Sequence, residues 1–382
     1  MRTHLIRAGF ILSLLTACQA PVRDLEAETS SLAVWQIETG TTHACARGGE
    51  ALYCWGENAS GQLGDGSLTD HALPQKVLVS ENFQTFALGG EHSCALDREG
   101  AAWCWGGNSA SQLGDGGTTS RATPAKVNQG SVRFASLSSG LATVCALATD
   151  RRLYCWGENG AGETANGTAG SALTTPTMTA VTSQFLQISM GTSHGCGITP
   201  QNILKCWGLN AHFQLGDGTV TSRPSPIVAD SSLKFRALSG GGSHSCALLL
   251  DGRPKCWGLN SSGQIGDSTT VIKAVAADVT TSEKFASLSS GADHTCALNA
   301  AGQAFCWGSN QYGQIGDGTL ASHDEPVAVD IGTVYETIKA GAQFTCGVTS
   351  HKQLRCWGRN HKGQLGLGSN TDQALPQTVA LP

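Results

Sequence analysis

The chain has 382 residues, a formal net charge of −5 and 40% hydrophobic residues, which is enough apolar surface for a large buried core. The acidic balance and the lack of a basic stripe argue against a nucleic-acid partner, because binding phosphates requires clustered Lys and Arg. No apolar stretch of about 18 residues is present, so the sequence predicts no membrane-spanning helix.

The first 17 residues have the pattern of an export signal. Arg2 and Arg7 give a basic start, an apolar stretch covers residues 8–15, and the segment is too short to span a bilayer. Its end, Leu-Thr-Ala followed by Cys18, resembles the lipobox of bacterial lipoproteins. This resemblance implies cleavage before Cys18 and lipidation of that residue, and two or more acyl chains give stable anchoring. The alternative is an ordinary secretory peptide that happens to contain a cysteine.

The residues after the signal set the expected location and domain boundaries. Gln19 stands where Asp is associated with inner-membrane retention, so we expect an outer-membrane lipoprotein of the bacterial cell envelope. A secreted or periplasmic protein is the alternative. Residues 18–33 are polar and aperiodic, which is typical of a flexible tether. Residues 34–382 then form one domain of seven repeats.

Seven cysteine pairs, each ending in Cys-Trp-Gly, define the repeats, and these endings recur every 50 or 51 residues. The pairs are Cys45 with Cys54, Cys94 with Cys104, Cys145 with Cys155, Cys196 with Cys206, Cys246 with Cys256, Cys296 with Cys306, and Cys346 with Cys356. A repeat of this length without long apolar runs is typical of a propeller, a solenoid or an array. The pairs use fourteen of the fifteen cysteines and leave Cys18 alone, which favours lipidation of Cys18.

Each repeat contains four short strand candidates and no helical period. In the sixth unit, residues 294–298 and 304–307 flank a tight turn at 300–302 and form a hairpin. Counting back from the turn places Cys296 opposite Cys306, and opposed Cα atoms lie about 4.5–5.5 Å apart, within reach of a disulfide. We therefore predict one disulfide per unit. Metal sites are disfavoured, because two cysteines per unit are too few ligands.

A tryptophan follows the second cysteine of every unit, so alternation along the strand places it on the opposite face of the sheet. Both faces are then buried between neighbouring sheets, with a ring of indoles as anchors. The tryptophans are Trp55, Trp105, Trp156, Trp207, Trp257, Trp307 and Trp357. Three residues later an asparagine suits a turn, where its amide bonds local backbone. The asparagines are Asn58, Asn108, Asn159, Asn210, Asn260, Asn310 and Asn360.

The repeat has a consensus that resembles a known family. Gly-x-x-His-x-x-Ala-Leu is followed by Trp-Gly-x-Asn-x-x-Gly-Gln-Leu-Gly-x-Gly and then Pro-x-x-Val, as in the second unit from His92 through Trp105 to Gln112. This string resembles the repeat of the regulator of chromosome condensation family. The resemblance implies an all-β, seven-bladed β-propeller of four-stranded blades, here with one disulfide per blade. Whether the C-terminal strand near Val379 completes its own blade or the first one stays open.

The family resemblance does not carry a function with it. The chromosomal member is a nucleotide exchange factor on a nuclear GTPase and uses an inserted wedge and a histone-binding face. These repeats have no such insertion, and the chain carries an export signal, so that activity is not expected. A similar secreted propeller inhibits β-lactamases through loops on one face, which implies that exported members can present a protein-binding surface.

Two sets of polar residues are expected to be structural. Histidine precedes the first cysteine by two residues in five units, at His43, His92, His194, His244 and His294. Phe344 takes the same position, so a metal site or a pH switch is not required there. Gly-Asp-Gly turns occur at Asp65, Asp115, Asp217 and Asp317. One carboxylate is short of the six to eight oxygens that bind calcium, so we expect neither a metal nor a cofactor.

The residues beside the Gly-Gln-Leu-Gly turn vary between units, and the bulky ones gather in units 4, 6 and 7. They are His212, Phe213, Tyr312, His361 and Lys362. A constant frame with variable, partly aromatic tips is typical of a binding face, although random surface drift gives the same pattern. The leading hypothesis is a monomeric, lipid-anchored module that binds an envelope or secreted protein. The alternatives are a structural or adhesive envelope component and, less favoured because the tips are mostly Ala, Ser and Gly, an enzyme using the central funnel.

Overall fold

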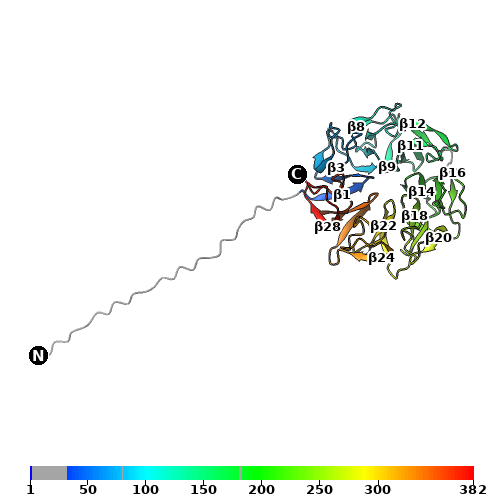
Figure 1. Cartoon of the computed structure of the whole chain (residues 1–382). Coiled ribbons are helices and arrows are strands. Elements are labelled where there is room, and N and C mark those ends of the chain that lie inside the picture. The colour runs from blue at the N-terminus through cyan, green and yellow to red at the C-terminus, as the bar shows by residue number, and fades with distance from the viewer. Residues whose placement is uncertain (2–31, 80, 180–182) are drawn as a thin grey trace. The chain divides into compact units, whose positions relative to one another are not determined.

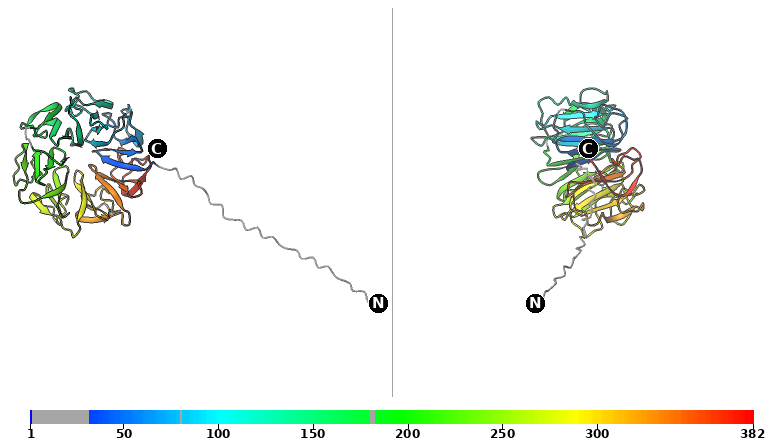
Figure 2. Two further views of the ribbon diagram at one scale, coloured as in Figure 1. Left: turned by 180° about the vertical axis from the view of Figure 1, so that it is seen from behind. Right: turned by 90° about the vertical axis from the view of Figure 1, so that its left-hand side faces the viewer.

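The computed structural model describes Met1 and residues 32–79, 81–179 and 183–382. The predicted signal peptide, Cys18 and nearly all of the predicted tether lie outside the described residues. Residues 32–382 form one compact unit, a ring of seven four-stranded antiparallel sheets around a central opening (Figure 1). Figure 2 shows the same ring from behind and from the side. No helix in the described ranges is long and apolar enough to cross a membrane.

Each blade consists of four strands that are consecutive in the chain. Blades 1 to 3 are as follows: blade 1 contains β1 (Val34–Thr39), β2 (His43–Gly48), β3 (Ala51–Gly56) and β4 (His71–Lys76); blade 2 contains β5 (Thr85–Leu88), β6 (His92–Leu96), β7 (Ala102–Gly106) and β8 (Arg121–Lys126); blade 3 contains β9 (Phe134–Ser139), β10 (Thr143–Ala148), β11 (Leu153–Asn159) and β12 (Gly170–Met178). Blades 4 and 5 follow: blade 4 contains β13 (Gln187–Met190), β14 (His194–Ile198), β15 (Leu204–Gly208) and β16 (Arg223–Val228); blade 5 contains β17 (Phe235–Gly240), β18 (His244–Leu249), β19 (Pro254–Gly258) and β20 (Lys273–Asp278). Blade 6 contains β21 (Phe285–Ser290), β22 (His294–Asn299), β23 (Ala304–Gly308) and β24 (His323–Val329); blade 7 contains β25 (Tyr335–Ala340), β26 (Phe344–Thr349), β27 (Leu354–Gly358) and β28 (Gln373–Val379).

The seven-bladed propeller predicted from the sequence is confirmed, and the structure answers how the ring closes. The C-terminal strand β28 pairs with β27 in blade 7, and the N-terminal strand β1 pairs with β2 in blade 1. No blade therefore shares a strand between the two ends of the described ring. The first strand of each blade lines the central opening, and the fourth lies at the periphery (Figure 1).

The predicted disulfide pairing is present in all seven blades. Cys296 lies opposite Cys306 in the β22–β23 ladder, as the hairpin count predicts. The same register recurs in the other six hairpins, and the Cα atoms of each bridged pair are 4.1 Å apart. These six bridges join Cys45 to Cys54, Cys94 to Cys104, Cys145 to Cys155, Cys196 to Cys206, Cys246 to Cys256, and Cys346 to Cys356. One residue per strand thus fixes the alignment of the two central strands of every blade.

The core consists of layers between blades, as the opposite facing of cysteine and tryptophan predicts. In one layer, Cys246 and Cys256 of blade 5 pack with Phe285 and Trp307 of blade 6. The rings of Phe285 and Trp307 stack with centroids 6.0 Å apart. The layer that closes the ring places the blade 7 disulfide against Trp55 of blade 1. The disulfide face of one blade therefore packs on the tryptophan face of the next.

Candidate binding face

Two sets of loops lie on one side of the ring because neighbouring strands run in opposite directions. They connect the first strand of a blade to the second and the third strand to the fourth. In blade 1 these loops meet directly, since the Glu57 backbone N–H donates to the Thr42 carbonyl over 3.0 Å. We call this side the loop face, and it carries all five residues predicted to bind a partner.

A buried asparagine holds each loop between the third and fourth strands in one shape. In blade 6, Asn310 accepts a hydrogen bond from the Ile315 backbone N–H (2.9 Å) and donates one to the Thr319 carbonyl (3.1 Å). The side-chain oxygen of Gln314 accepts from the Tyr312 backbone N–H (3.0 Å). The corresponding asparagine is at most 1% exposed in every blade. The predicted turn role of these asparagines is confirmed, and each loop tip is attached to a buried, hydrogen-bonded turn.

The aspartates of these loops also serve the turn, and the structure adds a partner for each. In blade 4, Asp217 accepts hydrogen bonds from Thr219 (3.0 Å) and from Arg223 (3.0 Å), six residues on. Partial burial opposes ionisation of this carboxyl group, but these hydrogen bonds outweigh it and lower the pKa of Asp217. The same spacing pairs Asp65 with His71, Asp115 with Arg121, Asp267 with Lys273 and Asp317 with His323.

These basic partners were not predicted from the sequence, although their constant offset from the aspartate was visible. Asp267 was not predicted either, because Ser replaces the second glycine of the turn there. Among the described residues, no group of three or more His, Cys, Asp or Glu side chains could hold a metal ion.

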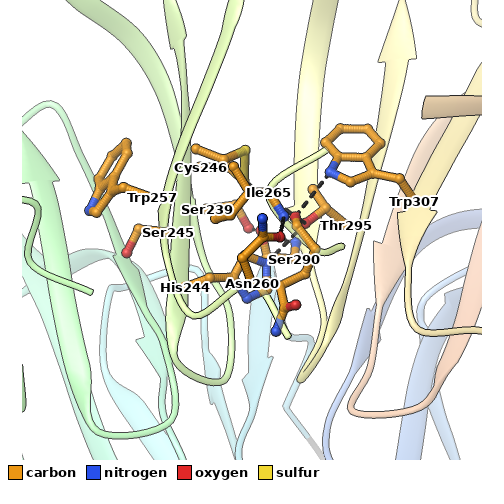
Figure 3. Close-up of a disulfide and its surroundings, with 12 residues drawn as sticks. Ser239, His244, Ser245, Cys246, Trp257, Asn260, Ile265, Ser290, Thr295 and Trp307 are labelled. Atoms are coloured by element: carbon orange, nitrogen blue, oxygen red, sulfur yellow. Dashed lines mark hydrogen bonds between the residues drawn. A yellow bond between two sulfur atoms is a disulfide. The ribbon is translucent and has the colours of Figure 1, made fainter. Parts of the chain in front are cut away.

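The five histidines lie buried at the junctions between blades. In Figure 3, His244 of blade 5 bonds Thr295 of blade 6 over 2.9 Å. The Thr295 hydroxyl donates to the Gln264 carbonyl (3.1 Å), which also accepts from the Trp307 indole N–H (3.0 Å). Since that hydroxyl proton is already used, Thr295 must accept from His244, and the Nε2 atom of His244 carries the proton.

This hydrogen-bond relay depends on a hydroxyl group in the following blade. His43, His194 and His294 find one in Ser93, Ser245 and Thr345. His92 instead faces the position of Val144, and neither of its ring nitrogens has a hydrogen-bond partner among the described residues. Burial lowers the pKa of His92 to about 3, with a smaller contribution from His43, so the ring stays neutral. The structural role predicted for these histidines fits their complete burial.

We expect the His92→Phe variant to be about 1 kcal/mol more stable than the wild type at pH 7, because it removes two unpaired buried nitrogens. Phe344 already fills the equivalent position in blade 7. His244→Phe is the matched control and should lose about 1 kcal/mol, since Thr295 loses a donor. Denaturant unfolding measures both, and changes of the same sign would contradict the assignment.

The five predicted binding residues share the loop face but differ in what they contact. His212 and His361 are exposed at the tips. Phe213 has φ +61°, a left-handed conformation at the position that Gly313 occupies in blade 6, so it belongs to the turn itself. The Arg359 guanidinium lies over the Tyr312 ring at 4.5 Å.

Lys362 completes the set and also forms ion pairs. It contacts Glu57 (2.9 Å) and Asp70 (3.2 Å) of blade 1. Tyr312 and Lys362 therefore also join neighbouring blades, which sequence reasoning did not reveal. Partner binding by the five residues stays a prediction.

The central opening contains a cavity of about 260 Å³, lined by the first strands of the blades. Serines on four of these strands face it, and the ionisable residues that line it are Glu38 and Lys339. These two pair with each other at 2.8 Å, with side chains 22% and 34% exposed respectively. Among the described residues, the lining therefore offers no free pair of ionisable groups for acid–base chemistry.

The fold and its repeated contacts define a repeat propeller, and comparisons with known proteins give its family. The regulator of chromosome condensation (RCC1) repeat matches residues 50–96, 99–147, 206–248, 301–348 and 354–382. A second form of the same repeat matches six segments, the first beginning at residue 83. The chain belongs to the RCC1 repeat family.

Individual relatives are similar at modest identity. The Ultraviolet-B receptor UVR8 of Arabidopsis thaliana is 26% identical over 197 residues, which is 50% of this chain and 45% of the receptor. The chain thus spans less than half the length of this relative. The crystal structure of human WBSCR16 matches with a TM-score of 0.80 and 21% identity, covering 87% of this chain and 95% of the other. Prp20p of Saccharomyces cerevisiae matches with a TM-score of 0.76 and 21% identity, covering 91% and 88%. At such identities these structures support the fold alone.

Proposed function

We propose that this protein is an interaction scaffold that is anchored at the bacterial outer membrane through lipidated Cys18 and presents its loop face to an envelope or secreted protein. The observation that carries the proposal is the contrast between constant loop frames and variable tips. Relatives support a role in protein interaction: one Prp20p study concerns its binding to Gsp1p and histones, and a second structure shows yeast RCC1 (Prp20) with Kap60. We propose no enzymatic activity.

The compartment follows from the disulfides. Seven bridges indicate an oxidising environment outside the cytoplasm, because reducing systems keep cytosolic thiols free. The lipid anchor is the finer part of the proposal. It is supported by the lipobox-like sequence before Cys18 and by the pairing of all other cysteines.

Cys18→Ala is expected to release the protein from membranes while its thermal stability stays that of the wild type, because all seven blades lie beyond residue 31. Membrane fractionation after a high-salt wash measures the release, and thermal unfolding serves as the control for folding. A variant that stays with the membrane pellet contradicts the anchor and leaves the proposed binding face untouched.

The binding face can be tested with the released protein as bait for envelope and secreted proteins. Against a recovered partner, His212→Ala combined with Phe213→Gly should weaken binding by about 1–3 kcal/mol, since aromatic and long side chains supply most interface energy. Glycine at position 213 suits the left-handed turn, so we expect no loss of stability.

Ser261→Ala with Ser262→Ala, at the equivalent tip of blade 5, is the matched control and should leave affinity unchanged. Equal affinity for both double variants places the partner elsewhere. Tyr312 and Lys362 are unsuitable as first probes, because their substitution also disturbs contacts between blades.

A further inference from the structure

Three kinds of hydrogen bond repeat across the junctions between blades. The relay from histidine to a hydroxyl group is described above and occurs at four junctions. The other two lie around the central opening, one between backbone groups and one between a serine and a backbone N–H. These three contacts are not present at every junction, and the junction between blades 7 and 1 differs most from the others.

A belt of backbone hydrogen bonds links the loops between first and second strands around the opening. Glycines such as Gly291 allow this approach, since a Cβ there would lie 2.3 Å from the Gly341 carbonyl oxygen. The belt bonds run from N–H to carbonyl over 2.9–3.2 Å, as Thr41 to Gly89, Gly90 to Leu141, Leu141 to Thr192, Thr192 to Gly241, Gly242 to Gly291 and Ala292 to Ala342. Within the described ring, no bond between these loops joins blade 7 to blade 1, although another backbone bond crosses that junction, from the Val34 N–H to the Lys352 carbonyl (3.0 Å).

A serine clasp forms the third contact. A serine on the first strand of one blade accepts a hydrogen bond from a backbone N–H of the next blade over 2.8–3.0 Å. The acceptors are Ser138, Ser189, Ser239 and Ser289. At the same position of the strand, blade 7 has Lys339 and blade 1 has Glu38.

The junction between blades 7 and 1, which we call the seam, lacks all three contacts among the described residues. Phe344 stands where the relay needs a histidine, and Ala44 where it needs a hydroxyl. Every other junction keeps at least the belt bond. The seam carries ion pairs instead: Lys339 with Glu38 at 2.8 Å, and Lys362 with Glu57 and Asp70.

Ion pairs of this kind are scarce elsewhere between blades. In the described part of the chain, Arg98 of blade 2 pairs with Glu50 of blade 1 at 3.9 Å, with side chains 61% and 86% exposed. Exposed pairs of that geometry contribute little. Arg355 of blade 7 also pairs at 2.7 Å with Asp330, which lies in the segment that connects blade 6 to blade 7. The contact between blades at the seam therefore depends more on ion pairs than the contact at any other junction.

We propose that the seam is an electrostatic latch and that the propeller ring opens there first. At the other six junctions a connecting segment of the chain ties one blade to the next, whereas β1 and β28 bring the two ends of the ring to the seam without a shared strand. Opening there breaks no sheet and stretches no loop. Salt screens partly exposed charges and so loosens this junction, while it hardly affects the hydrogen bonds between neutral groups that hold the others.

Matched backbone amides make the proposal testable by hydrogen exchange. The Gly368 N–H donates to the Ala72 carbonyl across the seam (2.8 Å). The equivalent bonds at other junctions join Gly318 to Ala374 (3.0 Å) and Gly218 to Ala274 (3.1 Å). We expect the Gly368 amide to exchange fastest of the three, and faster still when NaCl rises from about 0.05 M to about 1 M.

Charge variants of the full chain supply the second arm. Lys339→Met should speed exchange of the Gly368 amide about fivefold relative to Gly318 and Gly218. The swapped variant Glu38→Lys with Lys339→Glu should restore most of the protection. Ser239→Ala, which removes a clasp at the junction of blades 5 and 6, should leave the Gly368 amide unchanged.

Equal exchange of the three amides in the wild type overturns the latch, and so does a salt effect of the same size at all three. The salt series needs no variant, so a poorly folding variant does not prevent the test.

Discussion

Replacing Trp307 with alanine is expected to lower the free energy of unfolding by about 3–5 kcal/mol, the range for truncating a large buried aromatic residue. Its side chain is 0% exposed, stacks on Phe285 and fills the layer against the disulfide of blade 5. The variant also removes the donor to the Gln264 carbonyl. Urea or guanidinium unfolding with the disulfides intact measures the loss.

Trp35→Ala is the control for this measurement. Trp35 is 55% exposed on β1 and contacts Lys352 through its ring face, so its loss should cost less than about 1 kcal/mol. Trp307→Phe should fall between the two, because it keeps most of the apolar volume and loses the hydrogen bond. Similar losses for Trp307→Ala and Trp35→Ala would be inconsistent with the indole ring as the anchor of the junctions.

Acidification is expected to unfold the propeller well above the range in which carboxylates titrate. Burial lowers the pKa of four histidines to about 3, namely His43, His92, His244 and His294, with smaller contributions from neighbouring histidines at His92 and His244. Burial lowers that of His194 to about 4. Unfolded histidine titrates near 6.5, so below that pH the unfolded chain binds protons that the folded chain does not. Stability is thus complete above about pH 6.5 and falls as the pH drops toward 3.

The expected loss of stability follows from proton linkage. Between pH 8 and pH 5, each buried histidine that stays neutral in the folded protein lowers the free energy of unfolding by about 2 kcal/mol. Five of them together lower it by about 10 kcal/mol, which is comparable to the whole stability of a domain. Denaturant midpoints across this pH range test the prediction. His92→Phe should reduce the pH dependence by about one fifth. Midpoints that stay constant down to pH 5 contradict it.

The sequence predicted much of the fold because the repeat places the same residue types at the same structural positions. Hairpin counting paired Cys296 with Cys306 correctly, and strand alternation placed Trp307 on the opposite face. Both inferences use distances along one blade, where local geometry determines the outcome.

Contacts between blades were harder to predict, since they join residues about one repeat apart in the sequence. The pairing of His244 with Thr295 is an example. The sequence did contain a signal for these contacts. When a unit has histidine two residues before its first cysteine, the next unit usually has Ser or Thr one residue before its own first cysteine. Where Phe344 replaces the histidine in the last unit, Ala44 stands one residue before the first cysteine of the first unit. His92 and Val144 do not follow this pattern, so the sequence alone could not establish it.

Two residues of the loop face show a further limit of comparing the repeats by sequence. Phe213 looks like a tip residue beside His212, yet its φ of +61° shows that it replaces a turn glycine. The contacts of Lys362 with Glu57 and Asp70 depend on ring closure, which brings residues about 300 positions apart together. Neither feature follows from the repeat pattern.

The completeness of each blade bears on how such a protein can be rearranged. Near the seam, Leu32 and Leu381 both lie against Gly48, so the start and end of the ring are neighbours. A circular permutation that joins these ends and cuts the chain between β20 and β21 leaves every four-stranded sheet intact. By the same geometry, duplication of one unit adds a whole blade rather than half of one. The ring therefore has no structurally obligatory first blade, because each sheet is built from four consecutive strands.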